Sequence, residues 1–253
     1  MALFTMNIYS ICLGMQTKVN VIIPQKNTSG QIGVEENKED KGFKCLYLLH
    51  GLSDDETIWL RRTSIERYAQ KYGICVVMPC GDRSFYTDMK YGMKYYSFIS
   101  EELPRLISEF FHVSDKKEDT FIAGLSMGGY GALKMALRNP SKYAKVAGLS
   151  SVADIKGTAE RFHDTYVPIF GEDVNIPDED DLFYLSEKCN KNSEKPEIFL
   201  GVGTEDFLYE YNQKFRKHLE NIGYEFTYRE SQGVHNWNFW DEYIQYVLSW
   251  MFE

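Results

Sequence analysis

Short runs of strand-forming residues alternate with longer amphipathic stretches along most of the chain. Six of these runs have the length of buried β-strands and lie at 45–49, 74–78, 120–123, 145–151, 197–203 and 225–230. The amphipathic stretches predict helices at 64–72, 95–111, 129–137, 209–221 and 236–251. Because strand and helix alternate in this order in α/β proteins, the sequence predicts a mostly parallel central sheet with helices on both faces.

The first two strands of the sheet are expected to form an antiparallel pair. Residues 3–12 and 17–23 are strand-like and flank Gly14, a residue suited to a tight turn. The polar segment 27–42 that follows is predicted to be an exposed hairpin loop without a chemical role. Within the helix at 95–111, Pro104 is expected to introduce a kink.

One segment, 153–195, interrupts the alternation. It is rich in aromatic and acidic residues, and it is longer than an ordinary connection between neighbouring strands. Long loops of this kind often carry function, so we expect a short cap over the functional site; a surface excursion packed elsewhere is the alternative. No repeat or linker divides the chain, and residues 1–253 are predicted to form a single domain.

The motif with the clearest chemistry is Gly124-Leu125-Ser126-Met127-Gly128, which fits the pattern G-x-S-x-G. A strand precedes it and a helix follows it, which is the context that the motif needs. A sharp turn there would hold Ser126 in a strained conformation at a helix N-terminus, where free N–H groups favour negative charge. The sequence therefore predicts a serine that attacks a carbonyl carbon.

A nucleophilic serine needs a base, and the base needs an acid that orients it. Among the five histidines, His235 is the candidate base because it lies on a loop between the last strand and the last helix. Asp206 follows the strand at 197–203 and is the candidate acid; its neighbour Glu205 and, more weakly, Asp154 are alternatives. The order Ser126, Asp206, His235 is that of an α/β-hydrolase.

Two backbone N–H groups are expected to form the oxyanion hole. One belongs to Met127, the residue after the nucleophile, and the other to Leu52, on the loop that leaves the strand at 45–49. Gly51 allows this loop to turn, and His50 is predicted to brace it. No metal or cofactor is expected to take part.

Composition narrows the partners and the compartment. A net charge of −9 argues against nucleic acid and anionic membranes as partners. The N-terminus does not resemble a signal peptide, there is no run of 18 apolar residues, and the five cysteines lack metal-ligand spacing. We expect a cytoplasmic protein that binds a small-molecule ester, with a homo-oligomer left open.

Several further motifs carry a resemblance to a known family. They are His50-Gly51-Leu52-Ser53-Asp54-Asp55, the stretch 78–87, Glu101-Glu102-Leu103-Pro104, the stretch 123–132 and Gly233-Val234-His235-Asn236-Trp237. With these, the chain resembles the esterase D-like family of α/β-hydrolases, which includes S-formylglutathione hydrolases, feruloyl and acetylxylan esterases and mycolyltransferases. It is most similar to the bacterial tributyrin esterases.

The resemblance implies a triad of Ser126, Asp206 and His235, with Leu52 and Met127 as oxyanion donors. Two departures from the family bear on the substrate. The stretch 80–86 differs from the Asp-Thr-Ser-Pro-Arg-Gly-like sequence usual in S-formylglutathione hydrolases, and no carbohydrate-binding module is present. Intracellular action on esterified oligosaccharides stays open.

We therefore expect a serine carboxylesterase that hydrolyses short acyl esters, acetyl to butyryl. The alternatives are a feruloyl or acetylxylan esterase, an S-formylglutathione hydrolase and, further away, an acyltransferase or a non-catalytic binder. Seven residues near the motifs are candidates to line the pocket, although each aromatic one can equally belong to the core: Ser53, Trp59, Phe85, Tyr86, Tyr130, Phe207 and Trp237.

Overall fold

The computed structural model describes residues 1–25 and 42–253, so the loop predicted at 27–42 lies, except for Gly42, outside the described residues. The described residues form an eight-stranded sheet in the order β1-β2-β4-β3-β5-β6-β7-β8. Its strands are β1 Ala2–Ser10, β2 Met15–Ile23, β3 Cys45–Leu49, β4 Cys75–Pro79, β5 Thr120–Leu125, β6 Lys145–Leu149, β7 Glu197–Gly203 and β8 Phe226–Ser231.

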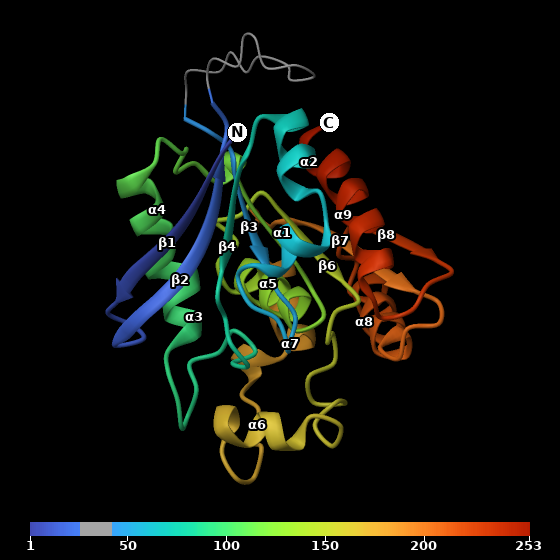
Figure 1. Ribbon diagram of the computed structural model, residues 1–253. Helices are drawn as coiled ribbons and strands as arrows, with labels where there is room; N and C mark the ends of the chain where they lie inside the picture. Colours follow the sequence, from blue (N-terminus) through green and yellow to red (C-terminus); the bar gives the residue numbers. More distant parts are fainter. Residues whose placement is uncertain (26–41) are drawn as a thin grey trace.

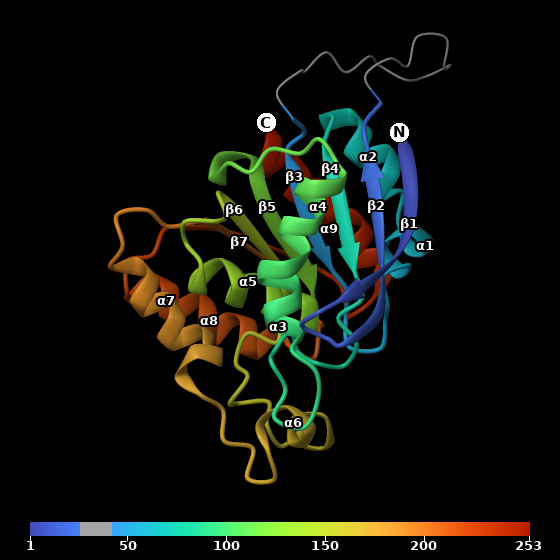
Figure 2. The same cartoon turned by 90° about the vertical axis from the view of Figure 1, so that its left-hand side faces the viewer.

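The topology matches the predicted fold class. Strands β3 to β8 run parallel, whereas β2 pairs antiparallel with both β1 and β4. Gly14 has φ +65° in the turn between β1 and β2, a conformation that glycine adopts without strain. Parallel strands end at the same edge of a sheet, and Figures 1 and 2 show this edge facing α6 (His163–Phe170).

Helices cover both faces of the sheet. One face carries α1 Ile58–Arg62, α2 Ile65–Tyr72 and α9 Trp237–Phe252. The other face carries α3 Tyr95–Ser97, α4 Leu103–Phe110, α5 Met127–Arg138, α7 Leu182–Asn190 and α8 Tyr209–Asn221. The short helix α1 has no counterpart in the sequence prediction, because five residues are too few to show a helical period.

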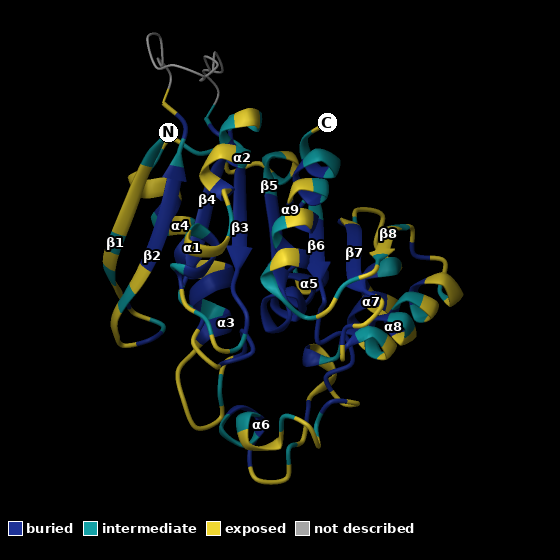
Figure 3. Ribbon diagram, turned by 45° about the vertical axis from the view of Figure 1, so that its right-hand side comes forward, coloured by how far each residue is buried: buried dark blue, intermediate teal, exposed yellow. Residues whose placement is uncertain are grey.

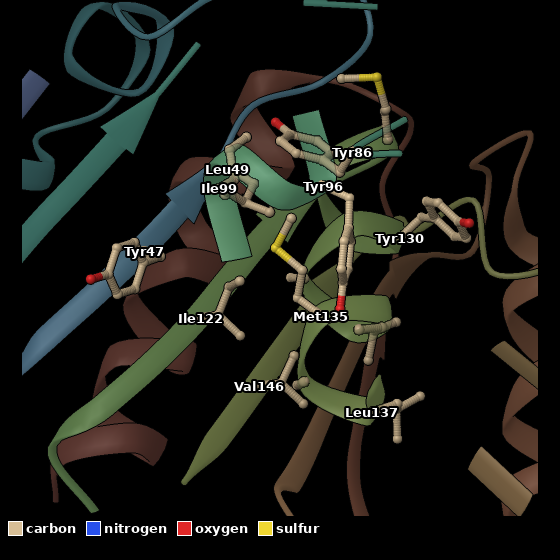
Figure 4. Packing of buried hydrophobic residues seen from close by; sticks show 14 of the residues in the cluster. Tyr47, Leu49, Tyr86, Tyr96, Ile99, Ile122, Tyr130, Met135, Leu137 and Val146 are labelled. Carbon is tan, nitrogen blue, oxygen red and sulfur yellow. The ribbon is translucent and has the colours of Figure 1, made fainter. Parts of the chain in front are cut away.

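Alternate residues of each central strand enter the two cores. Leu46 and Leu48 of β3 face α2 and α9, whereas Tyr47 and Leu49 face the side of α5. Figure 4 shows Tyr47 and Leu49 with Met135 of α5 in this second core. The central strands are buried, and exposed residues lie on the outer helices and on β1 (Figure 3). This burial on both faces explains why the central strands read as continuous apolar runs.

The predicted helix at 95–111 is interrupted. A π-helical turn, η1 Phe98–Glu102, separates α3 from α4, and Pro104 lies in the first turn of α4. A proline has no N–H and its ring crowds the carbonyl four residues earlier, here that of Ser100 in η1. The irregularity therefore lies in the turn that Pro104 disturbs. Glu102, in that turn, accepts hydrogen bonds from Ser10 Oγ (2.6 Å) and from the Ile11 N–H (2.7 Å), which fixes the turn between β1 and β2.

The segment at 153–195 contains more regular structure than its sequence indicated. It includes α6, a 3₁₀ turn η3 at Asp178–Asp180, and α7. Helix α7 packs against α5 and α8 and is the crossover between the parallel strands β6 and β7. Its apolar residues are gathered in 182–185 and only one more, Cys189, follows them on the buried face, which is too few to show a helical period in the sequence.

Candidate active site

A pocket of about 270 Å³ lies beyond the carboxyl ends of the parallel strands. Its walls come from loops that follow β3, β4, β5, β6, β7 and β8, so residues far apart in sequence meet there. The pocket is lined by Gly51, Leu52, Ser53, Asp54, Phe85, Leu125, Ser126, Met127, Val152, Phe162, Phe207, His235, Trp237 and Trp240.

Ser126 occupies the sharp turn between β5 and α5. Its backbone has φ +52° and ψ −116°, a conformation that costs a non-glycine residue about 1–3 kcal/mol. A Cβ on Gly124 would lie 2.4 Å from Gly128, and a Cβ on Gly128 would lie 2.5 Å from the carbonyl oxygens of Leu49 and His50. The two glycines of the motif are therefore required by the packing of this turn.

The side chains of Ser126, His235 and Asp206 form a hydrogen-bonded series. His235 Nε2 lies 3.0 Å from Ser126 Oγ, and His235 Nδ1 lies 2.9 Å and 3.0 Å from the two carboxylate oxygens of Asp206. Because an ionised carboxylate only accepts, Nδ1 carries the proton and Nε2 is the acceptor for the serine hydroxyl. The Asp206 side chain is fully buried and is also held by the Leu208 N–H at 2.8 Å.

The two alternative acids lie elsewhere. Glu205 is exposed, and its carboxylate accepts a hydrogen bond from Gln232 at 3.2 Å. Asp154 is buried but accepts from the Gly157 N–H at 2.8 Å and forms an ion pair with Lys214. Asp206 is thus the acid that meets His235.

The two predicted oxyanion donors, Leu52 and Met127, both line the pocket. Met127 is the first residue of α5, and the Ser126 side chain does not cap this helix because its hydroxyl is directed to His235. Within residues 1–25 and 42–253, neither the Leu52 nor the Met127 N–H donates a hydrogen bond to another protein group. Both N–H groups are available to an anion in the pocket.

His50 lies in the base of the loop that carries Leu52. Its Nε2 accepts a hydrogen bond from the Gly81 N–H at 2.8 Å, and its Nδ1 donates to the Gly51 carbonyl at 2.7 Å. Tyr86 Oη donates to the His50 carbonyl at 2.9 Å. Burial lowers the pKa of His50, which keeps the ring neutral and this network intact.

Comparison with known proteins adds the family. The model of the Esterase family matches residues 10–250. The chain belongs to the Esterase family. This esterase is 31% identical to an acetyl esterase of Caldicellulosiruptor saccharolyticus, over 99% of this chain and 98% of that protein.

Solved structures agree with the family. FphF of Staphylococcus aureus, a fluorophosphonate-binding serine hydrolase solved with substrate bound, is similar to this esterase with a TM-score of 0.89 and 35% identity, over 100% of this chain and 98% of that chain. An S-formylglutathione hydrolase (FrmB) of Staphylococcus aureus is similar with a TM-score of 0.86 and 35% identity, over 100% of this chain and 99% of that chain. The protein is a carboxylic ester hydrolase with the α/β-hydrolase fold, and its substrates are small-molecule esters.

No helix in the described part of this esterase is long and apolar enough to cross a membrane. Nor do the described side chains of histidine, cysteine, aspartate and glutamate gather into a group that could hold a metal ion.

Three of the seven pocket candidates lie elsewhere. Ser53, Phe85, Phe207 and Trp237 line the pocket of this esterase, but Trp59, Tyr86 and Tyr130 do not. Each of these three is buried and uses its polar atom inside the protein: Trp59 donates to the Leu49 carbonyl, Tyr86 to the His50 carbonyl and Tyr130 to the Asp180 carbonyl. They support the site as part of the core.

Three other apolar residues of the pocket, Val152, Phe162 and Trp240, were not predicted from the sequence. They lie in segments whose composition does not distinguish a core side chain from a pocket side chain. Phe85 has φ +50° and its neighbour Tyr86 has φ +52°, a backbone bend that the sequence pattern does not predict. This bend turns Phe85 towards the pocket and Tyr86 towards His50.

A buried cation fixes the Phe85 segment. Lys134 Nζ donates to Thr87 Oγ1 at 2.6 Å and to the Phe85 carbonyl at 3.3 Å, and it pairs with Asp180 at 3.0 Å. Burial lowers the pKa of Lys134, and the Asp180 carboxylate opposes that effect. Lys134 therefore ties α5 to a wall of the pocket and to the segment at 153–195.

Proposed function

We propose that this esterase hydrolyses short-chain acyl esters, acetyl to butyryl, with Ser126 as nucleophile, His235 as base and Asp206 as orienting acid. The observation that carries the proposal is the 3.0 Å approach of Ser126 Oγ to His235 Nε2 inside the pocket. A serine becomes a nucleophile when a neutral imidazole can take its proton, and the contact with Asp206 holds the ring in the required tautomer.

The mechanism proceeds through an acyl-enzyme. His235 Nε2 accepts the Ser126 proton as Oγ attacks the ester carbonyl, and the developing oxyanion accepts hydrogen bonds from the Leu52 and Met127 N–H groups. His235 then gives the proton to the leaving alcohol. Water repeats the sequence on the acyl-serine and releases the acid.

The size of the pocket favours a short acyl group. Its volume of about 270 Å³ is just below the roughly 300–1,000 Å³ typical of ligand pockets. The rings of Phe85, Phe162 and Phe207 limit its extension. Phe162 belongs to the segment at 153–195, which supports the proposal that this segment caps the site.

A chain-length series tests both parts of the proposal. With p-nitrophenyl acetate, butyrate, octanoate and palmitate, kcat/KM should peak at two to four carbons and fall steeply by eight. A long tunnel would instead raise kcat/KM with each CH₂, since burying one contributes about 0.8 kcal/mol. Ser126→Ala should lose essentially all activity, and a phosphonate probe should label the parent protein at Ser126 alone. An optimum at octanoate or longer contradicts the short-chain proposal, and retained activity in Ser126→Ala contradicts the triad.

A thioester is the second candidate substrate. The 35% identical S-formylglutathione hydrolase structure favours it. The ferulic acid esterase structure, at 23% identity and TM-score 0.80, shows a shared fold only. Assays with S-formylglutathione and with methyl ferulate beside p-nitrophenyl butyrate separate these cases. If kcat/KM for either compound exceeds that for p-nitrophenyl butyrate tenfold, that compound would represent the substrate class in place of the simple ester.

A further inference from the structure

An arginine without an acidic partner lies at the rim of the pocket. Arg161 is exposed, and its guanidinium carbon lies 4.2 Å from the centroid of the Phe207 ring. Its side chain forms no ion pair and no hydrogen bond with any residue in the part of the chain that the structure describes. Because no acid among the described residues neutralises it, this guanidinium is available to a charged group of a molecule bound at the pocket.

The same aromatic ring connects Arg161 with the candidate base. Phe207 lines the pocket, is 44% exposed, and its ring centroid lies 4.5 Å from that of His235. The Phe207 ring therefore contacts the guanidinium and, tilted by 52°, the imidazole. Phe162, the residue after Arg161, lines the pocket as well, so the backbone places this cation at the entrance.

The position of His235 decides which half of a substrate meets Arg161. In acyl transfer the base that accepted the serine proton gives it to the leaving alcohol, so the alcohol half must lie against the imidazole. Phe207 covers that imidazole and Arg161 covers Phe207. A substituent on the alcohol a few bonds from the ester oxygen would reach the guanidinium.

Asp54, a second charged side chain at the pocket, also favours placing an anionic substituent at Arg161. Asp54 lines the pocket on the loop that carries Leu52, and it forms no ion pair with Arg161. An anionic substituent would be repelled from this carboxylate and attracted to the guanidinium. The two charges together orient an anionic alcohol with its charge towards the rim and its ester oxygen towards Ser126.

We propose that Arg161 selects esters whose alcohol half carries a carboxylate. The inference rests on the proposed ester hydrolysis at Ser126 and specifies its substrate class. A guanidinium binds a carboxylate through two parallel N–H donors, and its ring-stacked position restricts its motion before the substrate arrives. Arg161 acts on binding and orientation of the leaving group and takes no part in proton transfer.

The test compares two esters that differ in one charge. 4-Acetoxybenzoate carries a carboxylate on its leaving group, and methyl 4-acetoxybenzoate is its neutral partner. In Arg161→Gln, kcat/KM for the carboxylate should fall about two- to fivefold, within the range of a solvent-accessible ion pair, while kcat/KM for the methyl ester stays unchanged. Arg161→Lys should keep part of the preference, and added salt should weaken it in the parent enzyme.

Arg67 provides a matched control. It is also exposed and also lies over an aromatic ring, at 5.5 Å from the Tyr68 centroid, but on α2 and away from the pocket. Arg67→Gln also removes one positive charge and should leave kcat/KM for both esters unchanged. An equal loss in Arg67→Gln would show that only net charge matters, and this would overturn the proposal.

Two other results would also overturn it. If Arg161→Gln lowers kcat/KM equally for both esters, Arg161 only supports Phe207. If it lowers kcat/KM for neither ester, the substrate does not contact Arg161. Hydrolysis of the neutral ester by the parent enzyme reports separately on the proposed function. If the parent enzyme does not hydrolyse the neutral ester, ester hydrolysis at Ser126 is refuted. If it does, but Arg161→Gln leaves the ratio of kcat/KM between the two esters unchanged, only the role of Arg161 is refuted.

Discussion

At the scale of single residues, the strained backbone of Ser126 has a measurable cost. Ser126→Ala and Ser126→Gly both lack the hydroxyl, but only glycine adopts φ +52° and ψ −116° without strain. We expect both variants to be inactive and the glycine variant to be more stable than the alanine variant. Its free energy of unfolding should be about 1 kcal/mol higher, and its urea midpoint correspondingly higher. Equal urea midpoints would show that this turn is not strained.

The neighbouring acids Glu205 and Asp206 give a second prediction. Asp206→Asn should lower kcat about 10⁴-fold, since an amide cannot hold His235 in the tautomer that accepts the serine proton. Glu205→Gln is the matched control, because Glu205 is exposed and contacts Gln232. Steady-state kinetics of both variants decide the assignment, and the reverse order would make Glu205 the acid.

His50 makes stability depend on pH. Its pKa in the folded protein is below the ordinary value of 6.5, because the ring is buried and accepts the Gly81 N–H. The unfolded chain therefore takes up a proton first as pH falls. The stabilisation is complete above pH 6.5 and is lost as pH drops from there through the folded pKa.

Urea unfolding of the parent protein and of His50→Gln at pH 7.5 and 5.5 isolates this contribution. The difference in unfolding free energy between the two proteins should shrink by about 1 kcal/mol at the lower pH. A constant difference would mean that His50 does not titrate in this range.

The sequence was sufficient to single out the three side chains that meet at the pocket, because each follows a strand at the carboxyl edge of the sheet. It could not separate Trp59, Tyr86 and Tyr130, which are core, from Phe85 and Trp240, which line the pocket. That distinction depends on backbone bends such as the positive φ of Phe85 and on hydrogen bonds between distant segments.

At the scale of elements, the ion pair of Lys134 and Asp180 joins α5 to the segment at 153–195. Lys134→Met leaves the Asp180 carboxylate buried without its main partner and should cost about 3 kcal/mol of stability. Because Lys134 also holds the Phe85 carbonyl, kcat/KM should fall as well. Thermal and urea unfolding with p-nitrophenyl butyrate kinetics measure both effects.

The double variant Lys134→Met, Asp180→Asn is the control for that prediction. It removes both charges and should recover part of the lost stability. Equal stability of the single and double variants would show that the buried charge is not the cause.

Elements with a strong period were predicted well, and weakly patterned ones were not. The strands and the helices α2, α5, α8 and α9 lie within a few residues of their predicted positions. The π-helical turn before α4 carries the contacts of Glu102 with the turn between β1 and β2, and α7 packs against α5 and α8; no local pattern shows contacts of this kind.

At the scale of the whole molecule, the eight strands place all the chemistry at one end. The loops that form the pocket leave the carboxyl edge of the sheet, and α6 lies beyond them (Figure 1). Strand β1 begins and α9 ends at the opposite end in both views (Figures 1 and 2).

This polarity suits the protein to attachment on a solid support. A bead or electrode coupled through either terminus should leave the entrance facing solution, so kcat/KM for p-nitrophenyl butyrate should equal that of the free enzyme. The same coupling at Asp164, an exposed residue of α6, should slow bulky esters first because the support would stand beside the entrance. Equal slowing by all three attachments would show that substrates reach Ser126 from another side.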